Sequence, residues 1–338
     1  MKQEYFMRSG ALMGIADLVD ELGGDAKLIL SKAKLTLGEL ADGDHMIPFE
    51  SFVMVLEHAA HDLNCPSFGL QLSTHQSLQT MGKLGLLIRN CDSARNALMG
   101  AQRYMALHSR AAYWSFDEDA QFTYINRYQH FHSTGHARQY KELAMGVCFC
   151  LIKALVPNFK GYRLEFSHRP ISELKFYQQF FAMDVEFNRE QDRLVCDSKY
   201  LSQPITNFNE QVHQQVEHYL SELLADHGND IERQVRSLIL QTMGMQEHTM
   251  DNIAQLLHMH KRTLQRRLKD KGLNFKRILN EVRISTACWH LEASNMDITL
   301  LSEILGYSDL SAFSRAFKTH MKCSAIEWRR QKQAEINP

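Results

Sequence analysis

The sequence predicts an α+β N-terminal domain, with helices on a small, mostly antiparallel sheet, followed by an all-α C-terminal domain with two helix-turn-helix units. Three observations support this prediction. The length of 338 residues fits two domains of ~100–200 residues each. Hydrophobic residues change from helical spacing to alternation in the middle of the chain and then change back. Finally, positive charge gathers at the C-terminal end.

This charge division is large compared with the net charge of the whole chain. From Thr249 onward there are 15 Lys and Arg residues and 9 Asp and Glu residues, a net charge of +6. The whole chain has 38 Lys and Arg residues and 39 Asp and Glu residues. The first 248 residues therefore carry 23 basic and 30 acidic residues, a net charge of −7. A basic module joined to an acidic body is typical of proteins that bind a polyanion.

Composition excludes several other classes of protein. With 44% hydrophobic and 23% charged residues, the chain is unlike disordered, collagen-like or disulfide-rich proteins. Its seven cysteines are irregularly spaced and include no Cys-x-x-Cys pair, which favours reduced thiols. Because the sequence has no signal peptide and no apolar run of ~18–20 residues, we expect a cytoplasmic protein without a membrane partner.

The first half of the chain predicts helices and then a hairpin. Apolar residues recur at helical spacing in residues 10–22, 47–61 and 94–109. Residues 113–116 and 121–125 then alternate around an Asp-Glu-Asp turn and predict two paired strands.

Farther along, the same signals predict the rest of the N-terminal body. Residues 136–156 and 173–181 have helical patterns, and residues 163–168 have the pattern of a strand. Residues 185–187 and 193–196 flank a polar turn and predict a second hairpin.

A polar helical segment at residues 207–226 and another helix at 231–243 follow the body. The first segment has one apolar stripe, which either packs against the protein's own body or forms the seam of a dimer. The stripe consists of Val212, Val216, Tyr219, Leu220 and Leu223. We place the domain boundary near residues 244–248.

The first helix-turn-helix unit begins at Thr249, a residue type that caps helices. The helix after this cap has Ile253, Ala254 and Leu257 on its inward face, and a short turn follows. In the second helix, Leu264 and Leu268 face inward because they are four residues apart. The opposite face carries Arg262, Gln265, Arg266 and Lys269. A short capped helix, a turn and a basic second helix are typical of this motif.

The same layout recurs near the end of the chain. Asp297 caps one helix, and Asp309 caps another in which Phe313 and Phe317 face the core. The outward face of this last helix carries Ser311, Arg315 and Lys318. A long helix at residues 275–291 links the two units, so that their second helices can enter successive major-groove segments ~34 Å apart.

The basic end resembles the AraC/XylS family of transcription regulators in two stretches, IAQLLHMHKRTLQRRLKDKGLNFKRILNEVRISTACWHL and ILGYSDLSAFSRAFKTHMKCSAIEWRR. The resemblance implies that Arg262, Gln265 and Arg266 contact bases or phosphates of double-stranded promoter DNA. It places Leu310, Ser311, Ala312 and Arg315 on the matching surface of the second unit, where Arg315 is the only strong hydrogen-bonding candidate.

Four positions depart from the family pattern. His258 replaces the glycine of the first turn, His260 replaces the cap serine, and Lys261 replaces the proline that follows. Near the end, Ser324-Ala325 replaces a Ser-Pro pair. The base preference of the first unit therefore cannot be transferred from the family, and His258 would strain a turn that needs a positive φ.

The body resembles the arabinose-binding-type N-terminal domain found in some of these regulators, including ornithine-related and virulence-related ones. The similarity is carried by SHRPISELKFYQQFFAMDVEFNREQDRLVCDSKYLSQPI and, with the early helices, covers about residues 12–206. We therefore expect an effector-binding or dimerisation domain at 1–206, a helical linker at 207–247 and a DNA-binding domain at 248–338.

The resulting hypothesis is a transcription activator controlled by an unidentified small-molecule effector, with promoter DNA and RNA polymerase as partners. Repression and a homodimer stay open. One alternative is a constitutive DNA-binding protein whose N-terminal domain only dimerises. A remote alternative, an alkyl-acceptor DNA-repair regulator, lacks the Pro-Cys-His-Arg motif. Because no GxSxG, HExxH, P-loop or GxGxxG motif is present, we expect no catalytic residues and no cofactor.

Three further clusters have both a functional and a structural interpretation. His130, His132 and His136 suggest a metal site, but no Cys or acidic partner has ligand spacing, so we expect a loop cluster and no metal. Cys148 and Cys150 are expected in the core. Six aromatic residues either line a ligand pocket or pack the sheet on the helices; they are Tyr113, Trp114, Phe116, Phe122, Tyr124 and Tyr128.

Overall fold

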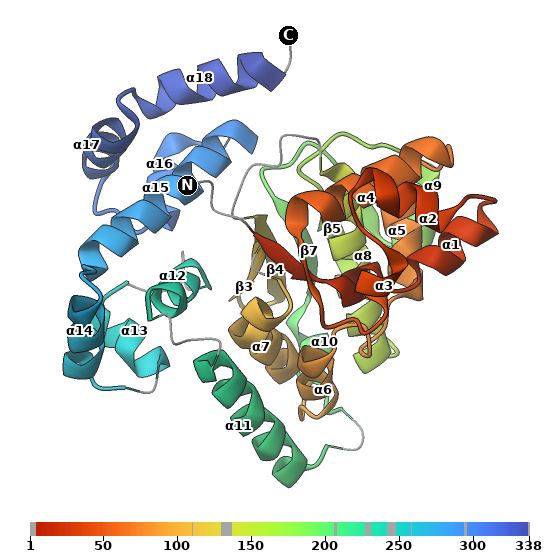
Figure 1. Ribbon diagram of the computed structural model, residues 1–338, viewed down its shortest axis with the longest axis horizontal. Helices are drawn as coiled ribbons and strands as arrows, with labels where there is room; N and C mark the ends of the chain where they lie inside the picture. Colours follow the sequence, from red (N-terminus) through yellow and green to blue (C-terminus); the bar gives the residue numbers. More distant parts are fainter. Residues whose placement is uncertain are drawn as a thin grey trace. The chain divides into compact units, whose positions relative to one another are not determined.

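The chain forms two compact units in a computed structural model (Figure 1). The N-terminal unit comprises Met1–Tyr128 and Ser133–Leu223, and the C-terminal unit comprises Gln129–His132 and Leu224–Pro338. The structure describes residues 5–109, 111–129, 137–205, 208–226, 231–241, 248–257, 259–293 and 296–336.

The three helices predicted in the first hundred residues are confirmed, with changed bounds. Residues 10–22 form a short 3₁₀ helix, η1 (Ser9–Leu12), and α1 (Ile15–Glu21). The second prediction corresponds to α4 (Phe49–Asp62), and the third to α7 (Ala94–Tyr104) with the 3₁₀ helix η3 (Met105–Leu107).

Several short elements before and between these helices were not predicted, because each spans only three to seven residues, too few to define a period. They are β1 (Phe6–Arg8), α2 (Ala26–Lys32), α3 (Leu37–Leu40), β2 (Met46–Pro48), α5 (Phe68–Leu72), η2 (Ser73–His75) and α6 (Lys83–Arg89).

A five-stranded sheet with the order β3-β4-β7-β5-β6 follows them. The predicted first hairpin is present as neighbouring strands joined by a short turn. Strands β4 and β5 each pair antiparallel with β7, whereas β5 and β6 run parallel, so the prediction of a mostly antiparallel sheet is confirmed. The strands are β3 (Ala112–Glu118), β4 (Phe122–Gln129), β5 (Gly161–Glu165), β6 (Asp184–Glu186) and β7 (Asp192–Asp197).

The predicted second hairpin is wrong, because β5 lies between β6 and β7. Leu164 of β5 pairs with Val185 of β6 on one side and with Leu194 of β7 on the other. Helix α9 (Leu174–Phe181) connects β5 to β6, which is the crossover that two parallel strands require. An alternating pattern predicts a strand, but it does not identify the neighbour of that strand.

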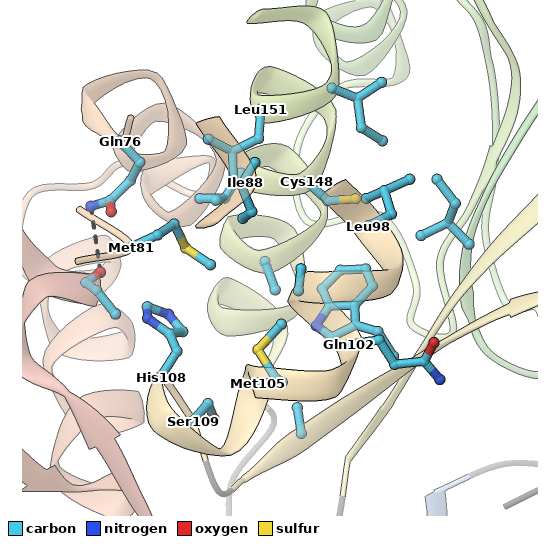
Figure 2. A pocket seen from close by; sticks show the side chains of 18 of the residues that line it. Gln76, Met81, Ile88, Leu98, Gln102, Met105, His108, Ser109, Cys148 and Leu151 are labelled. Carbon is cyan, nitrogen blue, oxygen red and sulfur yellow. Dashed lines mark hydrogen bonds between the residues drawn. The ribbon is translucent and has the colours of Figure 1, made fainter. Parts of the chain in front are cut away.

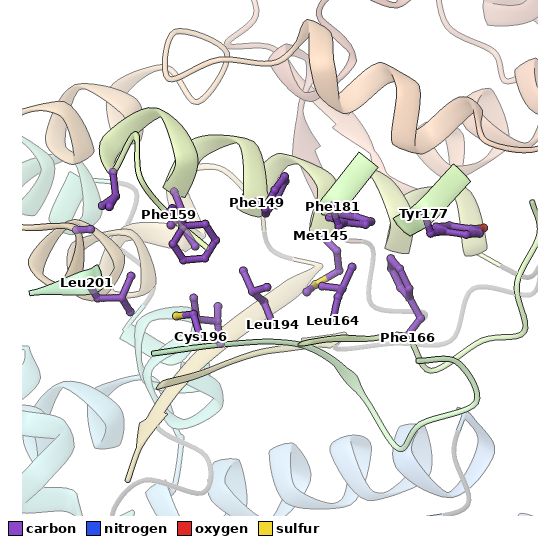
Figure 3. Close-up of a cluster of buried hydrophobic side chains, with 14 of the residues drawn as sticks. Met145, Phe149, Phe159, Leu164, Phe166, Tyr177, Phe181, Leu194, Cys196 and Leu201 are labelled. Carbon is purple, nitrogen blue, oxygen red and sulfur yellow. The ribbon is translucent and has the colours of Figure 1, made fainter. Parts of the chain in front are cut away.

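The core of the N-terminal unit lies between this sheet and α8 (Arg138–Leu155). In Figure 3, Phe149 and Phe181 on the helices face Leu164 and Leu194 on the strands. The rings of Phe149 and Phe181 meet edge to face with their centroids 5.2 Å apart. Burying a side chain of this size stabilises the fold by about 1.5–3 kcal/mol, so these contacts fix α8 on the sheet.

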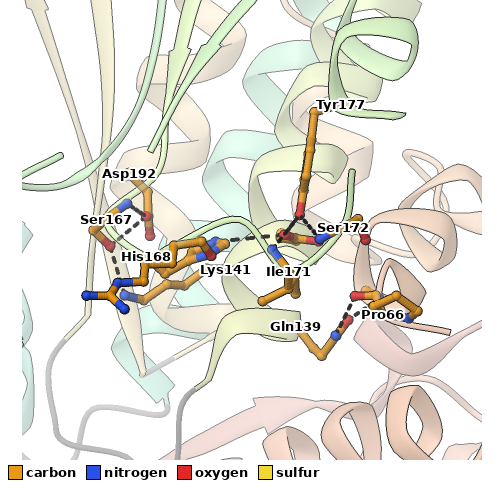
Figure 4. Close-up of polar contacts among 12 residues, drawn as sticks. Pro66, Gln139, Lys141, Ser167, His168, Ile171, Ser172, Tyr177 and Asp192 are labelled. Carbon is orange, nitrogen blue, oxygen red and sulfur yellow. Dashed lines mark hydrogen bonds and ion pairs between the residues drawn. The ribbon is translucent and has the colours of Figure 1, made fainter. Parts of the chain in front are cut away.

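A buried ionic network lies beside the apolar core (Figure 4). Arg127 Nη1 donates to Asp192 Oδ2 at 2.7 Å, and both side chains are at most 2% exposed. Ser167 donates to Asp192 from its backbone N–H and its Oγ, and Lys141 Nζ donates to Ser167 at 2.8 Å. Burial alone would raise the pKa of Asp192, but Lys141 and Arg127 hold it below its ordinary value.

A second buried acid, Glu142, has a pKa shifted in the opposite direction to that of Asp192. The Tyr177 hydroxyl donates to Glu142 Oε1 and accepts from the N–H groups of Ile171 and Ser172, each at 3.2 Å. Burial raises the pKa of Glu142 to about 8, against the lowering effect of Tyr177. Glu142 is therefore largely protonated at neutral pH, and α8 carries a neutral carboxylic acid inside the unit.

All elements of the C-terminal unit in the described ranges are helices. They are α12 (Ile231–Gln241), α13 (Met250–Leu256), α14 (Lys261–Asp270), α15 (Phe275–Ala293), α16 (Ile298–Ile304), α17 (Leu310–Met321) and α18 (Ala325–Ile336). Together with the α+β unit before them, they confirm the predicted fold class.

The units divide within α11 (Glu210–Asp226), earlier in the chain than the predicted boundary near residues 244–248. Helix α12 packs on α15, and Arg236 of α12 hydrogen-bonds Glu281 of α15. Structurally, α12 therefore belongs to the C-terminal unit. The functional division into residues 1–206, 207–247 and 248–338 stays a prediction.

The apolar stripe of α11 is only partly buried. Val216 and Leu220 are buried, whereas Val212 and Tyr219 are exposed. On the N-terminal unit, the Tyr104 hydroxyl hydrogen-bonds Ser221 Oγ at 2.7 Å, and Arg103 pairs with Glu217 at 2.7 Å. These polar contacts agree with packing against the protein's own body; the dimer seam stays untested.

Candidate nucleic-acid interface and ligand cavity

The first helix-turn-helix unit consists of α13 and α14. Thr249 caps α13, since its hydroxyl oxygen accepts from the N–H of Asn252 at 3.2 Å. Ile253 of α13 and Leu264 and Leu268 of α14 are at most 2% exposed. The inward faces predicted from spacing are therefore confirmed for these residues and Ala254, whereas Leu257 is only partly buried. They leave one face of α14 to solvent.

That solvent face carries all four side chains predicted for the first unit. Arg262, Gln265, Arg266 and Lys269 are exposed. No salt bridge to any described residue holds Arg262 or Arg266, so both guanidinium groups are available for phosphates or base edges. The neighbouring Lys261, in contrast, pairs with Asp251 at 2.6 Å.

His260 caps α14 in the position where the family has serine. Its Nδ1 accepts from the N–H of Arg262 at 3.3 Å, and its backbone is extended, with φ −72° and ψ 141°. The helix start is therefore kept despite the substitution. The expected strain at His258 concerns a residue outside the described ranges.

The second unit, α16 and α17, repeats this construction. Asp297 Oδ1 accepts from the N–H of Thr299 at 2.7 Å, and Asp309 Oδ1 accepts from the N–H of Ala312 at 2.7 Å. Phe313 and Phe317 are fully buried. The predicted contact residues Ser311, Arg315 and Lys318 lie on the exposed side of α17.

Helix α15 joins the two units. Figure 1 shows α13 and α14 at one end of α15, and α17 and α18 both pack on α15. Arg283 of α15 donates to the carbonyl of Gly306 at 2.7 Å, and its guanidinium lies 4.9 Å from the centre of the Tyr307 ring. With 19 residues, α15 is about 28 Å long, close to the repeat of a major groove.

The N-terminal unit contains a cavity of about 110 Å³ between α7, α8 and strands β3 and β4 (Figure 2). Among the six aromatic residues considered as pocket residues, Trp114 and Phe116 line it, whereas Phe122, Tyr124 and Tyr128 do not. The side chain of Tyr113 is outside the description. Cys148, expected in the core, is also part of the wall; burial raises the pKa of its thiol, which keeps it protonated.

Sequence reasoning missed most of this wall, including His108. His108 is 7% exposed, and burial, together with the nearby Arg8, lowers its pKa to about 3. Arg8 Nη1 lies 3.5 Å from His108 Nδ1, and Arg8 itself pairs with Asp44 at 2.7 Å. No local pattern could have revealed this cluster, because its members lie up to 100 residues apart in the chain.

Other kinds of site have less support. The described residues contain no group of three His, Cys, Asp or Glu side chains placed to bind a metal. His130, His132 and His136 lie outside the described ranges. None of the seven cysteines, all of which are described, forms a disulfide. None of the helices in the described ranges has the length and apolarity needed to cross a membrane.

Two family models match parts of the chain and agree with this arrangement. Residues 23–205 match the arabinose-binding domain of AraC transcription regulators, N-terminal part, and residues 253–331 match a helix-turn-helix domain. The first match alone covers more than half of the chain. The chain belongs to the AraC family of transcription regulators. The family predicted from the two motif stretches is therefore confirmed.

Two proteins named as regulators match this chain over nearly its whole length. The chain is 26% identical over 319 residues to the HTH-type transcriptional regulator VirS of Mycobacterium tuberculosis, covering 94% of each. It is 23% identical over 307 residues to the ornithine utilization regulator of Pseudomonas aeruginosa, covering 90% of each. The crystal structure of the transcriptional regulator CdpR from Pseudomonas aeruginosa aligns with a TM-score of 0.42 at 20% identity, covering 78% of this chain and 87% of that one. The protein is a DNA-binding transcription regulator.

Proposed function

We propose that this regulator is an activator whose promoter affinity is controlled by a small molecule bound in the N-terminal cavity. The observation that carries the proposal is the presence of two features in one chain. One is a cavity of about 110 Å³ in the N-terminal unit, and the other is a pair of exposed basic helices joined by α15 in the C-terminal unit.

On DNA, the two exposed helix faces would have different roles. Arg262, Gln265 and Arg266 have the side chains that form paired hydrogen bonds with base edges, above all arginine with guanine. Lys269 and Lys318 suit phosphates, since a lysine is a compact charge without the planar fork of arginine. Ser311 and Arg315 would make the contacts of the second unit.

Control by the effector would be a shift between two populations. A ligand that binds one arrangement of the N-terminal unit more tightly raises the share of that arrangement, and promoter affinity changes by the same coupling free energy. Activation would then follow from contact between the bound regulator and RNA polymerase, in the cytoplasm.

A constitutive regulator whose N-terminal unit only dimerises is the second candidate. Val212 and Tyr219 on α11 support it, because they are apolar and exposed at 37% and 44%. Light scattering combined with promoter binding separates the candidates. A dimer whose promoter affinity no small molecule changes would favour the second one.

The first prediction tests the DNA-binding side on the full-length protein. Affinity for a duplex from its own upstream region should fall about 100-fold or more between ~50 and ~200 mM salt, since Lys and Arg contacts release counterions. The double variant Lys269→Ala/Lys318→Ala, which removes the two side chains assigned to phosphates, should reduce the salt slope by about two. Arg89→Ala, at an exposed arginine of the N-terminal unit, is the matched control and should leave the slope unchanged. Equal slopes for all three proteins would contradict the assignment.

A further inference from the structure

We infer that the cavity takes a neutral, mostly apolar molecule with one hydrogen-bond acceptor, and that His108 Nε2–H donates to that acceptor. This inference rests on the proposed function, because it names the chemical class of the effector. The similarity to arabinose-binding domains and to an ornithine regulator would suggest a sugar or an amino acid, whereas the wall of this cavity favours neither.

The cavity wall carries no formal charge, which limits the charge of its ligand. The residues that line the cavity include no Asp, Glu, Lys or Arg. The nearest cation, Arg8, is already paired with Asp44 and donates to the carbonyl of Thr80 at 2.9 Å. A carboxylate or an ammonium group would therefore be buried without an opposite charge, which is strongly unfavourable. This excludes amino acids, polyamines and acid anions as good ligands.

The cavity wall has few polar groups, which limits the number of hydroxyl groups on its ligand. Apolar side chains dominate the wall, and one of its few amides is already engaged, since Gln76 Nε2 donates to the carbonyl of Met13 at 2.6 Å. A sugar needs a partner for each of its hydroxyl groups when it leaves water. An apolar ring or alkyl chain needs none and would gain contact with Met81, Met105 and Leu151 (Figure 2).

The protonation state of His108 determines which of its ring nitrogens can donate a hydrogen bond. Its ring is neutral, because its pKa is about 3, and a neutral imidazole has one N–H donor and one acceptor nitrogen. Arginine can only donate, so Nδ1, 3.5 Å from Arg8 Nη1, is the acceptor and Nε2 carries the hydrogen. No described residue hydrogen-bonds Nε2. This N–H is therefore available to donate to an acceptor atom on a ligand.

The volume limits the size of the ligand. An apolar cavity of about 150 Å³ in another protein stays dry and binds benzene. About 110 Å³ therefore suits one small ring or a short alkyl chain, and a substituent on the ring requires the wall to adjust. Met81, Met105 and Cys148 in the wall allow some adjustment, because their side chains are soft and flexible.

Calorimetry on the full-length protein tests this class with matched probes. Acetophenone has an aromatic ring and one carbonyl acceptor, whereas ethylbenzene has nearly the same shape and no acceptor. We expect acetophenone to bind about tenfold more tightly than ethylbenzene. Benzoate, L-arabinose and L-ornithine should show no binding that depends on the cavity.

Variants connect this binding to the cavity and to His108. His108→Phe should lower acetophenone affinity about tenfold and change ethylbenzene affinity by less than twofold, a difference that a general structural defect would not produce. Ala144→Leu reduces the cavity and should weaken both probes; Ala154→Leu, exposed on the same helix, should weaken neither. If circular dichroism shows that Ala144→Leu is unfolded, Leu151→Phe serves the same purpose.

Two results would overturn the inference. One is absence of binding by both acetophenone and ethylbenzene. The other is binding of benzoate, L-arabinose or L-ornithine that Ala144→Leu abolishes and Ala154→Leu does not. Acetophenone that binds in the cavity but leaves promoter affinity unchanged would support the ligand class and contradict effector control, so the two proposals can fail separately.

Discussion

At the scale of single residues, the chain keeps structural roles while changing the residue types that fill them. His260 stands where the family has a cap serine, and its ring nitrogen still accepts from the N–H of Arg262. Glu142 and His108 are titratable side chains in buried positions. Burial raises the pKa of Glu142 and lowers the pKa of His108, so that the neutral form of each is favoured. Exposed charge, in contrast, is concentrated on α14, where it is available to DNA.

Arg266→Ala tests base recognition at one position of α14. The exposed Arg266 guanidinium should make a paired contact with guanine, so its loss should cost ~1–3 kcal/mol on the native site and flatten preference at one base pair. Lys276→Ala, also exposed, is the control and should weaken specific and random duplexes equally. Binding to a set of single-base variants of the site measures both. A uniform loss for Arg266→Ala would assign this residue to phosphate instead.

Glu142→Gln tests the buried carboxylic acid through the pH dependence of stability. The unfolded chain releases this proton near the ordinary pKa of 4.5, whereas the folded protein keeps it up to about pH 8. The contribution of Glu142 to the wild-type free energy of unfolding should therefore be largest below pH 4.5 and fall as pH rises toward 8. The variant lacks this loss and should exceed the wild type by on the order of 2–4 kcal/mol at pH 8.

Urea unfolding of both proteins at pH 5 and pH 8 measures that difference. The two proteins should have similar stability at pH 5. Glu190→Gln, at an exposed position, should follow the wild type at both pH values. Parallel pH profiles for Glu142→Gln and the wild type would show that Glu142 is ionised in the folded state.

At the scale of elements, α7 connects the cavity to α11. Leu98 and Ala101 of α7 line the cavity. At the C-terminal end of the same helix, Arg103 and Tyr104 hydrogen-bond Glu217 and Ser221 of α11. Since α11 leads along the chain into the C-terminal unit, a change in α7 on ligand binding has a direct route out of the N-terminal unit.

Tyr104→Phe tests this route. Removing the hydroxyl breaks its hydrogen bond to Ser221 Oγ and should destabilise the N-terminal unit by about 0.5–1.5 kcal/mol. Affinity for acetophenone should not change, because Tyr104 is not part of the cavity wall. The effect of acetophenone on promoter affinity should become smaller. Tyr124→Phe, which loses a hydroxyl bonded to Asp119 on a distant turn, is the control and should keep the full effect of acetophenone on promoter affinity. If acetophenone changes promoter affinity equally in both variants, the route through α11 is excluded.

At the scale of the whole molecule, division of charge corresponds to division of structure. The C-terminal unit, which also includes residues 224–248, has 17 basic and 13 acidic residues, a net charge of +4, and the N-terminal unit has 21 and 26, a net charge of −5. Within the C-terminal unit, Arg283 ties α15 to the turn of the second helix-turn-helix. The distance between the two DNA-binding helices is therefore set by a helix of about 28 Å and not by a flexible linker.

This geometry predicts a strict spacing on DNA. Adding five base pairs between the two half-sites turns one of them to the opposite face, and adding ten moves it one further turn of ~34 Å away. Both insertions should lower affinity about tenfold or more, because α15 cannot lengthen. Gel-shift titrations on the three duplexes measure this. Recovery of affinity with ten base pairs would show instead that the half-sites are bound by separate, flexibly joined units.

Sequence alone determined the parts of this protein that depend on local contacts. Thr249, Asp297 and Asp309 each cap a helix within three residues, and Leu264 and Leu268 face inward because of helical spacing. Both helix-turn-helix units, their exposed faces and the family could therefore be predicted, since a cap and a helix face involve only near neighbours in the chain.

The tertiary structure alone decided the features that depend on distant contacts. Strand β5 separates β6 from β7, α12 joins the C-terminal unit, and a cavity forms between segments as far apart as Met7 and Leu155. A strand pattern contains no information about its partner, and a cavity is the space that many packed segments leave unfilled. The candidate DNA contacts were therefore open to prediction from sequence, whereas His108 and the chemistry of the effector site were not.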